Sequence, residues 1–141
     1  MKALLFSLGE ELLGIPIEEV RELVRIKELE HLPRQPKWIK GIIKHREKVY
    51  PVVSLSSILV LEEPEKLIGL VPYRDLPFIL GIGNILGIFD IELRAERMDL
   101  LPSEYMLGIG EHEGKLVLIL NIEKLLEKRR LKRLEKISKR K

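Results

Sequence analysis

Short apolar runs that alternate with turn-forming residues most strongly constrain how this chain can fold. Residues 2–7 and 11–17 are two such runs, and Leu8-Gly9-Glu10 between them predicts a hairpin. Further strands are expected at residues 39–44, 48–55, 67–73, 76–83, 85–91 and 115–120. Turn chemistry separates strands at residues 74–75, 83–84 and 111–114. A strand about every 8 to 12 residues is typical of a β-barrel or β-sandwich, so the chain is predicted to be mainly β.

Helical signals are few before the C-terminal segment. Residues 18–24 follow a proline and carry three apolar side chains at helical spacing, which predicts a short helix. One helical turn is expected at residues 56–61. The charged, proline-interrupted stretch 62–66 is the expected internal boundary.

The length of 141 residues suits one compact domain, or two small subdomains that share a core. No apolar run approaches the roughly 18 to 20 residues of a membrane span, and residues 1–9 lack the features of a signal peptide. We therefore expect a soluble, cytoplasmic protein. The absence of Cys excludes disulfides, thiol nucleophiles and thiolate metal sites. With no Thr, one Gln, two Asn and 33% charged residues, the composition is typical of a thermophile.

Basic residues are concentrated at the C-terminus. Residues 122–141 hold ten Lys or Arg and three Glu, a net of +7, which leaves −4 on the rest of a chain with net charge +3. The apolar side chains of this segment form two sets that point in different directions on a helical wheel. These are Ile122, Leu125 and Leu126, followed by Leu131, Leu134 and Ile137.

A helix is expected at about residues 122–138. Because one straight helix could not bury both apolar sets, we expect its first turns to dock on the body and the remainder to be a solvated, fraying basic helix. The alternative is that the second set meets an acidic partner or an anionic membrane surface.

Residues 36–55 carry the most specific pattern in the chain. Two expected strands, 39–44 and 48–55, flank a charged turn that contains Arg46. Pro51 cannot donate a ladder hydrogen bond, so the second strand is expected to lie at a sheet edge or to break at a bulge. The scaffold holds a side chain at such a turn where a partner can reach it.

This segment resembles the motif W/F-I-x-G-x-x-N-x-R-G-x-x-x-P-V-x-D-L of CheW-like domains, the adaptor family of bacterial and archaeal chemotaxis. Residues 4–23 resemble the opening motif of that family, and residues 104–110 and 115–126 resemble its closing segments. Three blocks in the right order along almost the whole chain form a specific signal.

The resemblance implies two small five-stranded SH3-like β-barrel subdomains packed together, with a C-terminal basic α-helix. The first barrel is expected at about residues 12–65 and the second at about 66–115, with residues 1–11 and 116–121 completing the barrels. It also implies a non-enzymatic adaptor that couples the cytoplasmic tip of a methyl-accepting chemotaxis receptor to the regulatory domain of a CheA-type histidine kinase. No cofactor, metal or nucleic acid is then expected, and membranes are met only through the receptors.

Six residues are expected to bind partners: Val20, Glu22, Gly41 and Arg46, which match functional positions of the family, together with Trp38 and Lys44. We predict an ion pair between Arg46 and Glu22 that either orders the loop or takes part in binding. Val20 and Gly41 match positions tied to docking a receptor's helical hairpin, with core packing and a backbone requirement as the respective alternatives. Trp38, the only Trp, either anchors an interface or covers the open end of the barrel.

Departures from the family pattern gather in the same loop. Lys44, Glu47 and Ser54 stand where Asn, Gly and Asp are usual. Leu13 replaces an aromatic residue of the opening motif. Gly would allow a positive backbone angle at position 47 at low cost, whereas Glu would be strained there. We therefore expect a turn of different shape or a redirected Arg46, and an altered choice of partner.

Other features support few further functions. The Gly-rich stretch 81–87 lacks a strand–turn–helix context, so hairpin glycines explain it better than a dinucleotide site. His31, His45 and His112 fall in separate turns without metal-ligand spacing, and His112 is expected to be solvated. No catalytic constellation can be proposed from residue order. The main alternative function is a small β-barrel RNA- or ribosome-associated protein that uses the basic tail.

Overall fold

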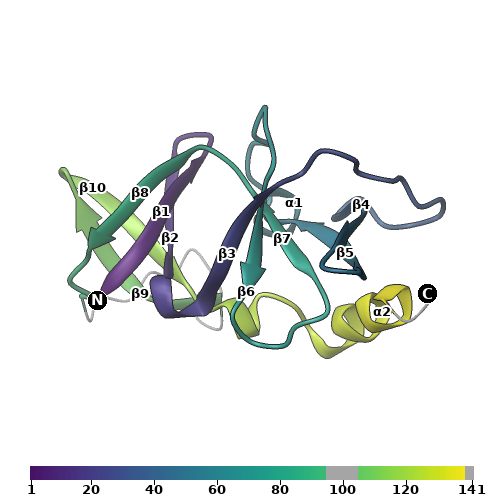
Figure 1. Cartoon of the computed structure of the whole chain (residues 1–141). Helices are drawn as coiled ribbons and strands as arrows, with labels where there is room; N and C mark the ends of the chain where they lie inside the picture. Colours follow the sequence, from purple (N-terminus) through teal and green to yellow (C-terminus); the bar gives the residue numbers. More distant parts are fainter. Residues whose placement is uncertain (95–104, 139–141) are drawn as a thin grey trace.

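The structure is a computed structural model that describes residues 1–94 and 105–138 (Figure 1). Within these residues, ten strands form two five-stranded sheets. Sheet A consists, in spatial order, of β8 (Ile85–Asp90), β1 (Lys2–Leu8), β2 (Glu11–Pro16), β10 (Lys115–Leu120) and β9 (Met106–His112). Sheet B consists of β3 (Val20–Arg25), β6 (Ile68–Pro72), β7 (Ile79–Ile82), β5 (Lys48–Ser54) and β4 (Ile39–His45).

The helical segments of the described residues are short. They are η1 (Ile17–Glu19), α1 (Leu55–Leu59), η3 (Ile122–Lys124) and α2 (Lys128–Ser138). Among the described residues, none of these helices is long and apolar enough to cross a membrane. The prediction of a mainly β protein with two five-stranded units and a C-terminal helix is confirmed.

The two units are open sheets and not closed barrels. In the part of the chain that the structure describes, no ladder joins the edge strands β8 and β9 of sheet A, or β3 and β4 of sheet B. Two isolated bridges, Glu30 with Ile42 and Arg94 with Ile109, extend the sheets beyond β4 and β9. β5 is an inner strand, so the expected edge position is wrong. The alternative, a bulge at Pro51, is also wrong, because Pro51 stays in register opposite Ile42 of β4. The ladder of β5 to β7 begins at Val52, one residue after the proline.

The two sheets have the same spatial arrangement of strands, although the strands follow one another in a different order along the chain. In sheet B, the hairpin β4–β5 is followed across the sheet by β7, which is parallel to β5, then by β6 and the edge strand β3. In sheet A, the hairpin β9–β10, the strands β2 and β1, and the edge strand β8 repeat this order. Sheet B is continuous in sequence, whereas sheet A takes β1 and β2 from the N-terminus. The sheets therefore do not divide at residues 65 and 66, where the sequence pattern placed the boundary between the barrels.

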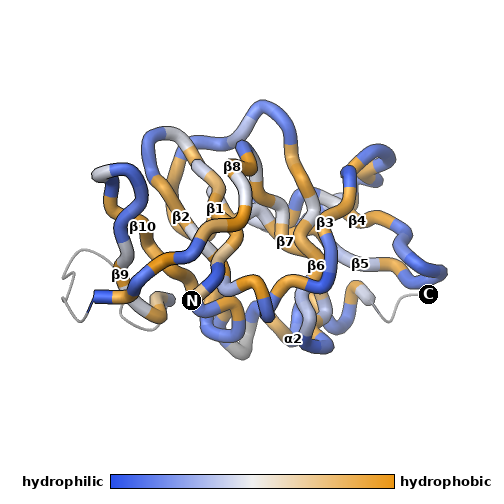
Figure 2. The backbone as a smooth tube through the Cα atoms, turned by 60° about the vertical axis from the view of Figure 1, so that its left-hand side comes forward, coloured by the Kyte–Doolittle hydropathy of each residue, from blue (hydrophilic) through white to orange (hydrophobic). Residues whose placement is uncertain are grey.

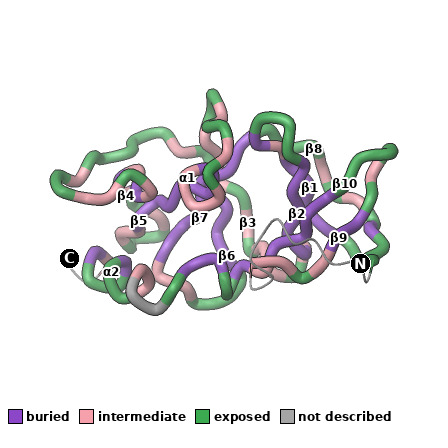
Figure 3. Tube along the Cα trace, turned by 180° about the vertical axis from the view of Figure 1, so that it is seen from behind, coloured by how far each residue is buried: buried purple, intermediate pink, exposed green. Residues whose placement is uncertain are grey.

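Most of the core is shared by the two sheets. The largest cluster of buried apolar side chains includes Phe6 of β1, Leu70 of β6 and Leu134 of α2, each 0% exposed. Because side chains alternate along a strand, Leu5 instead joins a smaller cluster of sheet A, and Val52 joins the corresponding cluster of sheet B. Figure 2 shows apolar residues, and Figure 3 buried residues, along the inner strands of both sheets. Neither sheet has a large core of its own.

Residues 18–24 do not form the predicted helix. They form the end of η1 and most of β3, which pairs with β6. Burial alternates along β3, and Leu23 is 40% exposed. A short apolar run can match both the helix and the strand period, and here pairing with β6 decides the outcome.

The C-terminal segment is two helices and not one. η3 ends at Lys124 and α2 begins at Lys128, so residues 125–127 interrupt the helix. This break lets both apolar sets reach the same core, which includes Ile122, Leu125, Leu126, Leu134 and Ile137. α2 packs against β5 of sheet B (Figure 1). The expectation of a solvated, fraying second part is wrong for Leu131–Ser138, because its apolar face is covered.

The Gly-rich stretch 81–87 is a connection between the sheets and not a hairpin. β7 belongs to sheet B and β8 to sheet A, so Gly83 and Asn84 join the two. The Asn84 carbonyl accepts a hydrogen bond of 3.1 Å from the Ser7 amide. A Cβ at Gly83 would lie 2.2 Å from Cβ of Pro64, so this close approach requires glycine.

Candidate partner-binding site

The charged turn between β4 and β5 is a two-residue loop. His45 pairs with Lys48, which leaves Arg46 and Glu47 in the loop with φ angles of 50° and 67°. Positive φ at both loop residues is typical of the type I′ turn, whose twist suits a β-hairpin. Glu47 therefore adopts the left-handed conformation that we expected it to avoid, and it is strained because it carries a Cβ.

The predicted ion pair between Arg46 and Glu22 is present. Nη2 of Arg46 lies 2.9 Å from Oε2 of Glu22. The Arg46 side chain is 67% exposed and the Glu22 side chain 28%. Such an exposed pair contributes roughly 0–1 kcal/mol to stability. Its main effect is positional: a guanidinium has five N–H donors, so Arg46 can bind Glu22 and still donate to a partner.

His45 is a second partner of Glu22 that was not predicted from the sequence. Its Nε2 lies 2.6 Å from Oε1 of Glu22. Because an ionised carboxylate only accepts, Nε2 is the donor. Glu22 stands on β3 and His45 on β4, which are the two opposite edges of sheet B. The sheet curls until its edges meet through these side chains, and no local sequence signal could have shown this.

Gly41 and Lys44 have different roles on β4. Gly41 is buried at a register shift and has φ of 152°. A Cβ there would lie 2.4 Å from the carbonyl oxygen of Glu30, which exchanges backbone hydrogen bonds of 2.8 and 2.9 Å with Ile42. This geometry supports the backbone requirement for Gly41. Lys44 is exposed, two residues before Arg46.

Val20 and Trp38 pack against the shared core. Val20 is partly buried at the start of β3, which supports its packing role. Trp38 is also partly buried, and the guanidinium carbon of Arg130 on α2 lies 5.2 Å from its ring centroid. Its carbonyl accepts a hydrogen bond of 2.8 Å from the Ser54 amide. Trp38 therefore packs between the shared core and Arg130 of α2. Among the six predicted positions, the described residues show one polar contact between two side chains, that of Glu22 with Arg46.

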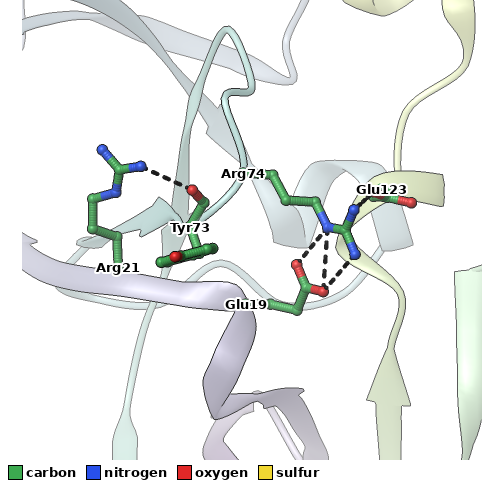
Figure 4. A network of polar contacts seen from close by, with 5 residues as sticks. All are labelled: Glu19, Arg21, Tyr73, Arg74 and Glu123. Carbon is green, nitrogen blue, oxygen red and sulfur yellow. Dashed lines mark hydrogen bonds and ion pairs between the residues drawn. The ribbon is translucent and has the colours of Figure 1, made fainter.

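A second charged cluster lies where the chain passes between the sheets (Figure 4). Arg74, in the β6–β7 loop, contacts Glu19 of η1, with Nε 3.0 Å from Oε2 and Nη2 3.1 Å from Oε1. Nη1 of Arg74 also pairs with Glu123 of η3. Beside this cluster, Arg21 donates to the Tyr73 carbonyl at 2.9 Å, and its guanidinium lies 5.7 Å from the Tyr73 ring centroid. This cluster was not predicted, because its members are distant in sequence.

The other histidines do not build a metal centre with described residues. No group of three or more His, Asp or Glu able to hold a metal ion occurs within residues 1–94 and 105–138. His31 is exposed. The His112 side chain is only 16% exposed, and its ring centroid lies 4.2 Å from that of Phe89. The expectation that His112 is solvated is therefore wrong, because it packs at the end of β9.

Comparison with known proteins places the chain among CheW-like domains. The family model of the CheW-like domain matches residues 2–130. Protein FrzA of Myxococcus xanthus is 32% identical over 137 residues, which cover 86% of this chain and 82% of the relative. Chemotaxis protein CheW of Treponema pallidum is 27% identical over 142 residues, which cover 92% of this chain and 84% of the relative.

A solved structure has the same fold. The crystal structure of scaffolding protein TtCheW from Thermoanaerobacter tengcongensis matches with a TM-score of 0.75 and 25% sequence identity. The match covers 89% of this chain and 87% of that chain, so it extends over both sheets. The chain belongs to the CheW-like domain family.

Proposed function

We propose that this protein is a non-enzymatic chemotaxis adaptor. It couples the cytoplasmic tip of a methyl-accepting chemotaxis receptor to the regulatory domain of a CheA-type histidine kinase. Family membership supports this proposal, as do the relatives named chemotaxis protein CheW and the similar fold of a scaffolding protein. The protein acts in the cytoplasm, where receptors recruit it to arrays at the membrane. It holds its partners in a defined geometry and adds no chemistry of its own.

The observation that supports a partner site at the Arg46 turn is the contact of Glu22 with both His45 and Arg46. It holds an exposed guanidinium at the tip of a two-residue hairpin. Lys44 and Lys48 are exposed on either side of the turn and add two positive charges near Arg46. A partner carboxylate or backbone carbonyl is the complementary group for such a guanidinium.

The six predicted positions take different parts in this proposal. Arg46 and Lys44 contact the partner directly, and Glu22 positions Arg46. Val20, Gly41 and Trp38 act through the fold: the first and last pack on the shared core, and Gly41 allows the close approach of Glu30 to β4. Their substitution is expected to reduce stability as well as binding.

Calorimetric titration against the regulatory domain of a CheA-type kinase from the same genome tests the proposal. We expect saturable binding that Arg46→Ala weakens by roughly tenfold or more, as for an interface hot spot. Arg94→Ala is the matched control, because it removes an exposed Arg–Glu pair, with Glu111, from sheet A. This control is expected to leave the affinity unchanged.

Two other results would change the conclusion. Binding that Arg46→Ala leaves intact would retain the adaptor function and move the contact away from the turn. Failure of the wild-type protein to bind both the kinase domain and a receptor tip would contradict the adaptor function itself.

A further inference from the structure

The chain passes between the two sheets at three places in the described residues. η1 joins β2 of sheet A to β3 of sheet B, and Gly83-Asn84 joins β7 to β8. η3 joins β10 of sheet A to α2, which packs against β5 of sheet B. The relative orientation of the sheets depends on these connections and on the shared core.

Arg74 contacts two of the three connections from a loop of sheet B. Its guanidinium makes the bidentate contact with Glu19 of η1 and the ion pair with Glu123 of η3 (Figure 4). The backbone supports the first contact, because the Tyr73 amide donates to the Glu19 carbonyl at 2.8 Å. The Glu19 side chain is only 19% exposed, so this half of the cluster is well enclosed.

We propose that Arg74 is a positioning residue that sets the orientation of sheet A relative to sheet B by clamping η1 to η3. The physical reason is that Arg74 determines the sign of the electrostatic interaction between η1 and η3. With Arg74 present, two carboxylates share one cation. Without it, the like charges of Glu19 and Glu123 repel each other across the junction. Removal of one side chain therefore turns an attraction between the connections into a repulsion.

The positive charge that Arg74 brings to the clamp is permanent. The side-chain hydrogen bond to Glu19 raises the pKa of Arg74 above its ordinary value, with a further contribution from the charge of Glu123. The guanidinium thus stays protonated at every pH at which the protein is folded. The interaction responds to salt, because the Arg74 side chain is 52% exposed and its pairs are partly screened.

The clamp also reaches the candidate partner site. Glu19 directly precedes Val20, the first residue of β3, and β3 carries Glu22, which holds Arg46. An adaptor transmits signals through the geometry in which it holds its partners, so the orientation of the sheets determines how they meet. This consequence rests on the proposed function, whereas the clamp itself does not.

Distance measurements between two spin labels test the clamp in the isolated protein. The chain has no Cys, so Arg25→Cys on β3 and Lys115→Cys on β10 give one exposed label on each sheet. We expect Arg74→Ala to shift or broaden the distance distribution between the labels. Arg74→Lys should do so partly, because an ammonium cannot bind a carboxylate in the same bidentate way. Glu123→Gln should also broaden it.

Arg94→Ala is the matched control for these measurements. It removes an Arg–Glu pair of similar exposure that lies within sheet A, so the distribution should equal that of the wild type. Raising the salt concentration to about 1 M should broaden the wild-type distribution toward that of Arg74→Ala, because the Debye length falls to about 3 Å.

An unchanged distribution in Arg74→Ala would overturn the proposal. If that variant does not fold, Arg74→Lys and Glu123→Gln decide the matter in the same way. In the kinase titration, Arg74→Ala should bind about two- to fivefold more weakly with the Arg46 turn intact, because a changed orientation of the sheets alters the geometry presented to the partner. If the wild type binds no partner, the adaptor function fails while the distance result still decides the clamp.

Discussion

Individual side chains determine the geometry of the candidate site at the Arg46 turn. Glu22 accepts from His45 and Arg46 and so joins opposite edges of sheet B. Its pairing with Arg46 was predicted through the family resemblance, but its pairing with His45 was not, because His45 carries no signal beyond its place beside the turn. For Glu47, the strain of a positive φ was predicted and a different turn was therefore expected. The hairpin nevertheless imposes the left-handed conformation on this residue.

Replacing Glu47 with Gly is expected to stabilise the protein by up to about 1 kcal/mol. The change removes the strain of a Cβ at φ of 67°, and the greater freedom of Gly in the unfolded chain offsets part of the gain. Chemical denaturation followed by Trp38 fluorescence measures the change. Lys48→Gly is the neighbouring control: it has no such strain to relieve and should cost about 0.5–1 kcal/mol. Destabilisation by Glu47→Gly would mean that the Glu47 side chain contributes more than its strain costs.

Tertiary contacts override local tendency at the scale of the element. The N-terminal hairpin follows its sequence pattern closely, since the two apolar strands β1 and β2 pair across a turn at Gly9. β3 and α2 do not. β3 was predicted as a helix and becomes a strand because β6 offers a ladder, while α2 docks because the chain breaks after η3. β9 was not predicted, because its two glycines interrupt the apolar alternation.

Leu134→Ala tests whether α2 is part of the folded core. Its side chain is 0% exposed in the shared cluster, so we expect a loss of about 2–5 kcal/mol in the free energy of unfolding. Lys132→Ala, on the exposed surface of the same helix, should change it by no more than about 0.5 kcal/mol. Urea denaturation of both variants supplies the comparison, and equal, small effects would mean that α2 frays from the body in solution.

The two sheets are stabilised together at the scale of the whole molecule. Their shared connectivity gives each a similar small inner cluster, and the largest cluster lies across both. Since neither sheet buries much apolar surface alone, they are expected to unfold in one cooperative transition.

Phe6→Ala on β1 of sheet A should therefore lower the stability of sheet B as well. Phe6 is 0% exposed in the shared cluster, and its truncation is expected to cost about 3–5 kcal/mol. Trp38 fluorescence, which reports on sheet B, and far-UV circular dichroism should shift to the same lower midpoint. Ile88→Ala, at a position 55% exposed on β8, should leave both midpoints almost unchanged. Two separate transitions in Phe6→Ala would contradict the shared core.

The β-rich class, most strands and turns, the charge of the C-terminal segment and the family could be predicted from the amino-acid sequence. These features depend on the spacing of apolar residues, on turn residues and on the order of motifs, all of which can be read directly from the sequence. The folded structure was needed to show which strand joins which sheet, where α2 docks and which charges meet. Glu22 and Arg46 are 24 residues apart and Glu19 and Arg74 are 55 apart, so their contacts exist only once the sheets have curled and packed.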